Sequence, residues 1–201
     1  MKIETEDQLR ALYGFPKGRA KDKSLPELEK HCINFIEHSP FLVMATYNAA
    51  GKMDVSPRGG KPGFVQVLNT TEIVIPDAKG NNRIDSLVNI VETGQIGSLF
   101  FIPGIDETLR INGSAHITVD PQLLARFSTE THPPKTCIVM RVEEAFLHCA
   151  KAFMRSKLWN PAVQVKRPGF PTIGQMLKDQ LNSQEEPESH AAMVKRYMKD
   201  I

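Results

Sequence analysis

The chain has 201 residues and a hydrophobic content of 41%, which is enough for one compact domain with a sizeable core. Its 25 Lys and Arg residues nearly balance its 23 Asp and Glu residues, so the formal net charge of +2 gives no general case for binding nucleic acid or a membrane surface. The N-terminal residues lack the apolar run of a secretory signal, and no uninterrupted apolar stretch approaches the ~18 residues that a membrane helix needs.

Residues 1–40 have the spacing of helices. Ser24, followed three residues later by Glu27, has the pattern of a capping box, so we expect a helix to begin there and to end at Pro40. The apolar residues of this helix fall on one face: Leu25, Leu28, Cys32, Phe35 and Ile36. We therefore expect residues 1–40 to form an N-terminal helical segment.

Short apolar or alternating runs predict a series of strands from residue 41 onward. They are FLVMATYN, MDVS, FVQVLN, EIVIPD, IGSLFFIPG, TLRINGSAHITVD and KTCIVMRVEEAFLHCAKAF, and the last is long enough to contain a bulge. The turn NAAGK joins the first two, with Gly51 free to adopt a positive φ. Consecutive short strands joined by turns predict a mainly β protein, an antiparallel barrel or sandwich with helices on its outside, rather than a doubly wound sheet.

One longer helix interrupts the strands. The segment GNNRIDSLVNIVETG places Ile84, Leu87, Val88 and Val91 on one helical face, and Gly94 follows where a helix C-terminus is expected. A shorter helix, PQLLARF, starts at a proline, which is tolerated in the first turn.

The region from residue 161 to the end is rich in Pro, Gln, Glu and Lys. An amphipathic pattern in TIGQMLKDQL predicts one helix there, and a weaker pattern near the end predicts a second. We expect a single structural domain in which residues 41–160 form the barrel and residues 161–201 form a peripheral helical tail.

The segment SPRGGK, between two predicted strands, concentrates polar groups and glycines in what we expect to be a loop. Arg58 offers a planar guanidinium that suits phosphate oxygens, Ser56 adds a hydroxyl, and Pro57 stiffens the backbone. The glycines would allow a ligand to approach the backbone closely. A solvated surface hairpin has the same composition and is the alternative interpretation.

A second candidate site is PDAKGNNRIDS, where a strand ends and a helix is expected to begin near Asn81 or Asn82. Free N–H groups at a helix N-terminus favour an anion, and Arg83 in the first turn would add positive charge. A cation there opposes the helix dipole by roughly 0.3–1 kcal/mol, so a bound anion would remove the conflict. The alternative is that Asn82 caps the helix and Arg83 points to water.

A third candidate lies on the predicted strand ETLRINGSAHI. Thr108 and Arg110 share one face of this strand, and Leu109 lies on the other. A hydroxyl and a guanidinium on one sheet face could hydrogen-bond a planar polar heterocycle. A strand face that simply meets solvent is equally compatible with the pattern.

The fourth candidate is the basic run of Lys151, Arg155 and Lys157 in HCAKAFMRSKLW, which we expect to continue the last strand. Basic residues beside an aromatic one can indicate nucleic-acid binding, but a single tryptophan in a near-neutral chain supports this only weakly. The competing interpretation is a segment that reaches across a dimer to a phosphorylated ligand.

Sequence motifs for metal sites, hydrolases, nucleotide-binding proteins and thiol enzymes are absent. The six histidines show neither HxH nor HExxH spacing, so we expect no metal site, and GxSxG, P-loop and GxGxxG motifs are absent. His148 and Cys149 are neighbours on a predicted strand and would point to opposite faces, which argues against a thiol–imidazole pair. The three cysteines contain no CxxC pair and indicate reduced thiols, hence a cytoplasmic location.

The order of these segments resembles the pyridoxamine 5′-phosphate oxidase-like superfamily of FMN-binding split barrels. The resemblance covers about residues 41–155 and rests on the succession FLVMATYN, NAAGK, MDVSPRGG, FVQVLN, EIVIPD, KGNNRIDSLVNI, IGSLFFIPG and ETLRINGSAHI. Within that superfamily, VSPRG and HCAKAFMRSKLW are similar to the motifs of one bacterial branch.

This resemblance implies a homodimer of six-stranded antiparallel Greek-key barrels with FMN at the dimer interface. The implied cofactor-binding residues are Ser56, Pro57, Arg58, Asn82 and Arg83 at the phosphate, Thr108, Leu109 and Arg110 along the flavin, and Lys151, Arg155 and Ser156 from the partner subunit.

The resemblance also implies an FMN-dependent oxidoreductase that takes electrons from NADH, NADPH or another small donor, with no catalytic residue assigned. The sequence departs from true pyridoxamine phosphate oxidases, since it has SPRGGK, GNNR and ETLR and no RLHDR-like stretch, so vitamin B6 oxidation does not follow. A non-catalytic flavin carrier or sensor, whose tail docks a partner, is the alternative function. The deazaflavin F420 is the rival cofactor, and haem is a more distant third.

Overall fold

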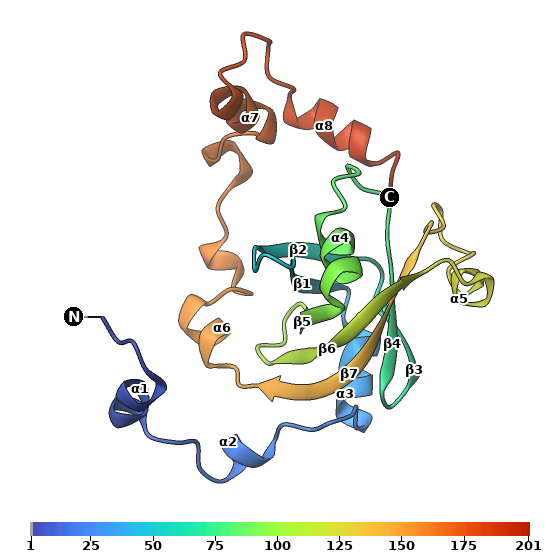
Figure 1. Ribbon diagram of the computed structural model, residues 1–201. Helices are drawn as coiled ribbons and strands as arrows, with labels where there is room; N and C mark the ends of the chain where they lie inside the picture. Colours follow the sequence, from blue (N-terminus) through green and yellow to red (C-terminus); the bar gives the residue numbers. More distant parts are fainter. Residues whose placement is uncertain (1) are drawn as a thin grey trace.

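Seven strands form one curved antiparallel sheet in the computed structural model, which describes residues 2–201 (Figure 1). The spatial order is β2-β1-β5-β6-β7-β4-β3. The strands are β1 (Phe41–Tyr47), β2 (Met53–Gly59), β3 (Gln66–Asn69), β4 (Glu72–Pro76), β5 (Gln95–Phe101), β6 (Thr108–Thr118) and β7 (Cys137–His148).

The mainly β antiparallel architecture is confirmed, but the strand number implied by the resemblance is wrong. The short edge strand β3 brings the total to seven rather than six. Within residues 2–201 no backbone pairing joins the two edge strands, β2 and β3, so the sheet is open and does not close into a complete barrel.

The hydrophobic core lies on one face of the sheet, and alternate residues of the central strands point into it. Leu42, Phe100, Leu109 and Ile111 are completely buried there. The expected bulge in the last strand is present, because Asn112 pairs with Glu144 while Gly113 pairs with Val142, which leaves one extra residue in β7.

Helix α3 (Lys30–His38) closes one side of this core, and its predicted apolar face is buried as expected. Its predicted start was wrong, because Glu29 rather than Ser24 caps it, accepting a hydrogen bond of 2.9 Å from the Cys32 N–H. Leu25 cannot be helical, since its backbone N–H and C=O both pair with Ala145 of β7. Helices α1 (Glu6–Tyr13) and α2 (Arg19–Asp22) stand away from the sheet (Figure 1).

Helix α4 (Asp85–Thr93) lies against β1 and β2 and ends at Gly94, which adopts the left-handed conformation expected there. The helical face that carries the valines is not the one that packs on the sheet: Val88 and Val91 are exposed, whereas Ser86 and Asn89 are buried. The reason lies in β2, whose side chains facing the helix are polar. The buried Asn89 side chain donates to Thr46 Oγ1 of β1 at 3.0 Å.

The remaining helices are α5 (Pro121–Ala125), α6 (Lys151–Ser156), α7 (Ile173–Leu181) and α8 (His190–Tyr197), with 3-10 turns at Pro161–Val163 and Arg167–Gly169. The last strand ends at His148, so the predicted continuation of that strand through the basic run was wrong, and residues 151–156 are helical instead. Phe153 of α6 packs on Phe101 of β5 and on Trp159, with ring centroids 5.8 and 5.6 Å apart. From there α7 and α8 arch over to the α4 side of the sheet (Figure 1).

None of the helices in residues 2–201 is both long enough and apolar enough to cross a membrane.

Candidate functional site

The candidate site is built on β2, whose alternation places Asp54, Ser56 and Arg58 on the side that faces α4. The expectation of a loop at residues 56–59 was wrong, because these residues pair in register with residues 41–44 of β1. A strand holds its side chains more rigidly than a loop does, so the site has a firmer base than the sequence indicated.

Four polar side chains form one hydrogen-bond network at the start of α4. Ser86 donates to Asp54 Oδ2 at 2.6 Å, and since a carboxylate only accepts, Ser56 then donates to Ser86 across 2.8 Å. Arg58 Nη1 donates to Ser56 Oγ at 3.0 Å, and its Nη2 donates to Ser86 Oγ at 3.3 Å. The network fixes the position of the Arg58 guanidinium.

Arg58 nevertheless has a buried nitrogen that these hydrogen bonds do not use. Its Nε is buried and has no hydrogen-bond partner among residues 2–201. An unpaired donor on a charged group is costly to bury, so this atom favours an anion at its side. Asp77 lies close enough to interact with this charge: burial raises the pKa of the Asp77 carboxyl, and the Arg58 guanidinium partly offsets that rise.

The segment before α4 differs from the prediction. The helix begins at Asp85, so Arg83 lies outside its first turn, where Arg83 Nε pairs with Asp85 Oδ2 at 2.9 Å. The expected conflict between Arg83 and the helix dipole therefore does not occur. Asn82 and Ile84 have positive φ angles of 61° and 51°, and for a β-branched residue such as Ile84 this conformation costs roughly 1–2 kcal/mol.

A cleft of about 750 Å³ opens between β2, the segment before α4 and the end of the tail. Its lining residues are Asp54, Ser56, Pro57, Arg58, Lys79, Gly80, Asn81, Arg83, Ile84, Asp85, Ser86, Arg196, Tyr197, Asp200 and Ile201. The tail was expected to be peripheral, yet its last residues form one wall. Asn82 lies in an adjoining cavity of about 250 Å³ that also contacts Arg58.

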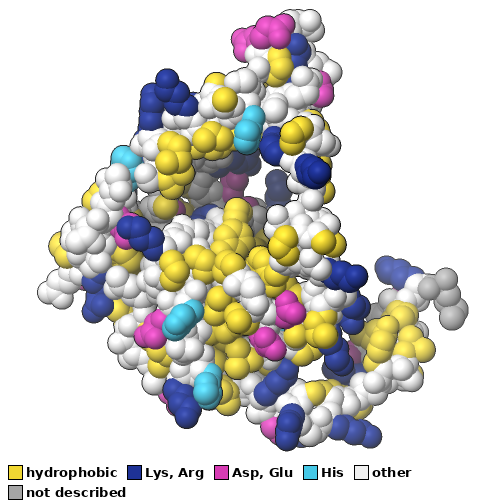
Figure 2. Space-filling view, turned by 180° about the vertical axis from the view of Figure 1, so that it is seen from behind, with side chains coloured by type: hydrophobic (Ala, Val, Ile, Leu, Met, Phe, Trp, Pro, Cys, Tyr) yellow, Lys and Arg dark blue, Asp and Glu magenta, His cyan; other side chains and the backbone are white. Residues whose placement is uncertain are grey.

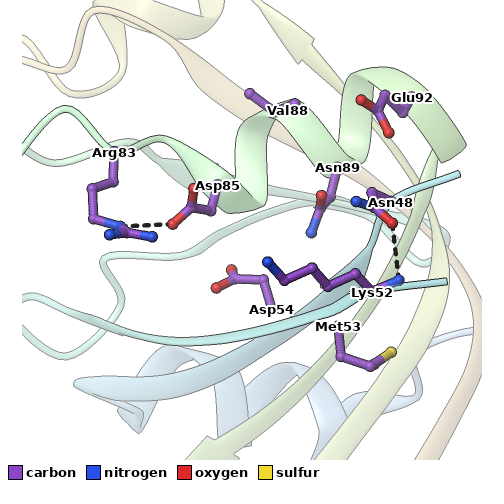
Figure 3. Close-up of a pocket in the computed structure, with 9 residues that line it drawn as sticks. All are labelled: Asn48, Lys52, Met53, Asp54, Arg83, Asp85, Val88, Asn89 and Glu92. Atoms are coloured by element: carbon purple, nitrogen blue, oxygen red, sulfur yellow. Dashed lines mark hydrogen bonds and ion pairs between the residues drawn. The ribbon is translucent and has the colours of Figure 1, made fainter. Parts of the chain in front are cut away.

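A smaller pocket of about 290 Å³ adjoins the cleft and shares Asp54, Arg83 and Asp85 with it. Figure 3 shows Arg83 paired with Asp85 at one end and the Lys52 side chain running beneath α4 toward Asp54. Glu92 lies at the far end of this pocket. Charges of both signs therefore line this continuation of the cleft.

The other predicted site residues do not line the cleft of their own chain. Arg110 shares a sheet face with Thr108, as expected, and its Nη2 donates to Glu144 Oε2 at 3.0 Å. Leu109 is completely buried in the core, so its side chain is not available to a surface ligand. The predicted partner-subunit residues Lys151, Arg155 and Ser156 are exposed on α6.

Glu144 ties the N-terminal segment to the sheet beside Arg110. A hydrogen bond from Ser24 at 2.7 Å lowers the pKa of Glu144, and Asn112 and Arg110 lower it further. A carboxyl group with a depressed pKa stabilises the fold above the pKa of the unfolded chain and loses that contribution as the pH falls through its folded pKa. This attachment therefore weakens only in acid.

Sequence reasoning missed several residues of the cleft. Asp54 had a signal, because it alternates with Ser56 and Arg58 on one strand face, and Ser86 had a weaker one in its position within NNRIDS. Lys79 is in the candidate segment but was not singled out. Arg196, Tyr197 and Asp200 had no local signal, since nothing in the tail indicates which surface it meets.

The opposite face of β1 and β2 is apolar. Met53 and Val55 are 61% and 62% exposed, and their cross-strand neighbours are Tyr47 and Ala45. Figure 2, which shows the molecule from behind, has apolar side chains gathered across the middle of the body. Surfaces of this kind mark interaction sites in soluble proteins.

Comparisons with known proteins agree with this architecture. The profile of the family described as Pyridoxamine 5′-phosphate oxidase matches residues 28–149, which is more than half of the chain. No curated protein matches significantly.

Among solved structures, HupZ from Group A Streptococcus is similar with a TM-score of 0.51 and 16% sequence identity, covering 60% of this chain and 93% of HupZ. An FMN-binding protein from Syntrophomonas wolfei subsp. wolfei has a TM-score of 0.42 and 13% identity, covering 58% of this chain and 81% of its own. At these identities the likeness to HupZ indicates a shared fold.

Proposed function

The chain belongs to the pyridoxamine 5′-phosphate oxidase family, and from that premise we propose that it binds FMN in the cleft beside Arg58 and acts as a flavin-dependent oxidoreductase on a small molecule. The observation that carries this proposal is the buried, unpartnered Nε of Arg58, held in place by Ser56 and Ser86 at the wall of the cleft.

The residues present fit a phosphorylated flavin. Arg58 offers a charge-assisted donor, and Ser56, Asn82, Lys79 and Arg83 surround it with further polar or cationic groups. The cleft volume of about 750 Å³ lies within the usual range for cofactor sites. When bound, the flavin would transfer electrons between a reduced donor such as NADH or NADPH and an acceptor.

Within this proposal, the protein binds and orients the cofactor. Pro57 and Arg58 hold the phosphate end, while Thr108, Arg110, Lys151, Arg155 and Ser156 would contact the ring system from a second copy. That division of roles is compatible with the absence of these five residues from the lining of the cleft in their own chain. Vitamin B6 phosphate is not proposed as the substrate, because the motifs that bind it in true pyridoxamine phosphate oxidases are missing.

A homodimer follows from the same proposal. The exposed apolar face around Met53, Val55 and Tyr47 would be covered by the same face of a second copy. We expect light scattering to give a dimer for the wild type and a monomer for Val55→Lys, because a buried unpaired lysine would be costly at the interface.

Val119→Lys is the matched control for this experiment. Val119 is 68% exposed, similar to Val55, but it lies outside the apolar face. This variant should remain dimeric. A wild-type protein that is a stable monomer and still holds flavin would contradict the dimer proposal.

Two measurements test the function itself. Native mass spectrometry of the purified protein should give the mass of bound FMN; F420 or haem in its place would replace the cofactor assignment. Anaerobic mixing with NADH or NADPH should then bleach the flavin absorbance, and an added acceptor should restore it. If neither nucleotide nor a panel of small reductants bleaches a flavin that stays bound, the protein is a flavin carrier or sensor and not an oxidoreductase.

A further inference from the structure

We propose that the last part of the tail, residues 189–201, is a hinged lid over the flavin site, and that Asp200 latches it by occupying Lys79. This inference rests on the proposed function, because it concerns entry to the same cleft. It goes beyond that function in assigning the tail a role in how fast a phosphorylated ligand enters and leaves.

The lid forms one wall of the cleft. Arg196, Tyr197 and Asp200 line it together with Arg58 and Arg83, which lie on β2 and before α4. A ligand that reaches Arg58 through this cleft therefore meets the lid. Figure 1 shows the end of the chain beside the segment that precedes α4.

Within residues 2–201, two exposed polar contacts join the lid to the body of the protein. Lys79 Nζ pairs with Asp200 Oδ1 at 2.5 Å, and both side chains are about half exposed. His132 Nε2 lies 2.9 Å from the Lys199 carbonyl oxygen and donates to it. Exposed contacts of this kind contribute little stability, so this attachment opens easily.

The other end of the tail is held more firmly. The Trp159 ring stacks on Phe153, and its Nε1 donates to the Ile105 carbonyl oxygen at 2.9 Å. Figure 2 shows an opening between the tail and the body of the molecule. A segment with aromatic packing just before its first residue and two exposed polar contacts near its last one can swing about the aromatic anchor.

Contacts within the tail hold the Arg196 side chain of the lid in one position. Glu188 holds Arg196 with two hydrogen bonds of 3.0 and 2.7 Å, and the Arg196 guanidinium lies 4.6 Å from the centre of the Tyr197 ring. The backbone at Glu188 in turn packs so closely on Gly174 of α7 that a Cβ at Gly174 would collide with it. Arg196 is thus positioned by α7 and the turn before α8.

The latch competes with the ligand for one cation. Asp200 places a carboxylate on Lys79, which is one of the cations available to a phosphate in the cleft. An entering phosphate would take this lysine and release Asp200, and the departing phosphate would return it. The latch is closed only in the free protein, so it slows entry and lowers the affinity for the ligand, and it leaves the dissociation rate unchanged.

The test is stopped-flow measurement of FMN binding through quenching of flavin fluorescence, using full-length apoprotein. We expect Asp200→Asn to raise the association rate constant by about 3- to 10-fold and to leave the dissociation rate constant unchanged, since a neutral amide holds Lys79 less tightly in the free protein. Glu6→Gln breaks an equally exposed ion pair, with Arg10 of α1, and should leave both rates unchanged.

A second pair of variants acts at a distance from the cleft. Gly174→Ala should displace the turn at Glu188 and with it Arg196, and so raise the dissociation rate, whereas a Cβ at Gly169 meets open space and Gly169→Ala should have no effect. If wild type binds FMN and both Asp200→Asn and Gly174→Ala match their controls within a factor of two, the lid is overturned. If none of the proteins binds FMN, the proposed function fails instead.

Discussion

Replacing Arg58 and Arg83 together by alanine is expected to weaken FMN binding by about 10²- to 10⁴-fold. Each arginine would lose a charge-assisted hydrogen bond worth roughly 1.5–3 kcal/mol. Arg58 should account for the larger share, because its Nε has no partner within the described residues, whereas Arg83 already pairs with Asp85. Fluorescence titration of the apoprotein with FMN measures the effect.

Arg19→Ala is the control for this experiment. Arg19 is exposed on α2, far from the cleft residues, and its loss should leave the affinity for FMN unchanged. Thermal unfolding of all variants separates lost binding from lost folding. If the double variant binds FMN as tightly as wild type does, the phosphate assignment to this cleft is wrong.

Gly113→Ala is expected to destabilise the fold by about 3 kcal/mol or more, which is the largest stability effect that the structure predicts for a single methyl group. Gly113 is buried at the bulge between β6 and β7, and a Cβ there would collide with the backbone carbonyl of Arg141. A backbone oxygen in the middle of the two longest strands cannot move aside without breaking their pairing. Urea unfolding monitored by circular dichroism gives the change in free energy.

Gly169→Ala makes the matched comparison. Gly169 has no positive φ, and a Cβ at this position would meet nothing within 4 Å. Its substitution should change the free energy of unfolding by less than about 0.5 kcal/mol. Equal stability of the two variants would show that the bulge tolerates a side chain and that the strand pairing is looser than described.

Residue composition alone predicted only part of the candidate site. Arg58 was selected because guanidinium, hydroxyl and glycine occur together, and it does line the cleft. Arg83 was selected by the same reasoning, but the helix starts after it and its guanidinium pairs with Asp85. A local motif indicates which groups are available, and only the backbone path decides where each one points.

The sequence by itself determined the antiparallel strands, the buried face of α3, the glycine at the end of α4 and the family, because alternation, helical spacing and segment order are properties of neighbouring residues. The tertiary structure decided the rest. Leu25 pairs with Ala145 of β7 and is therefore not helical. Helix α4 packs its polar side against the polar face of β2, so its valines are exposed. The pair Lys79–Asp200 joins residues 121 positions apart, and no periodic pattern in the sequence indicates such a contact. Its energy depends on two surfaces that exist only once the sheet has formed.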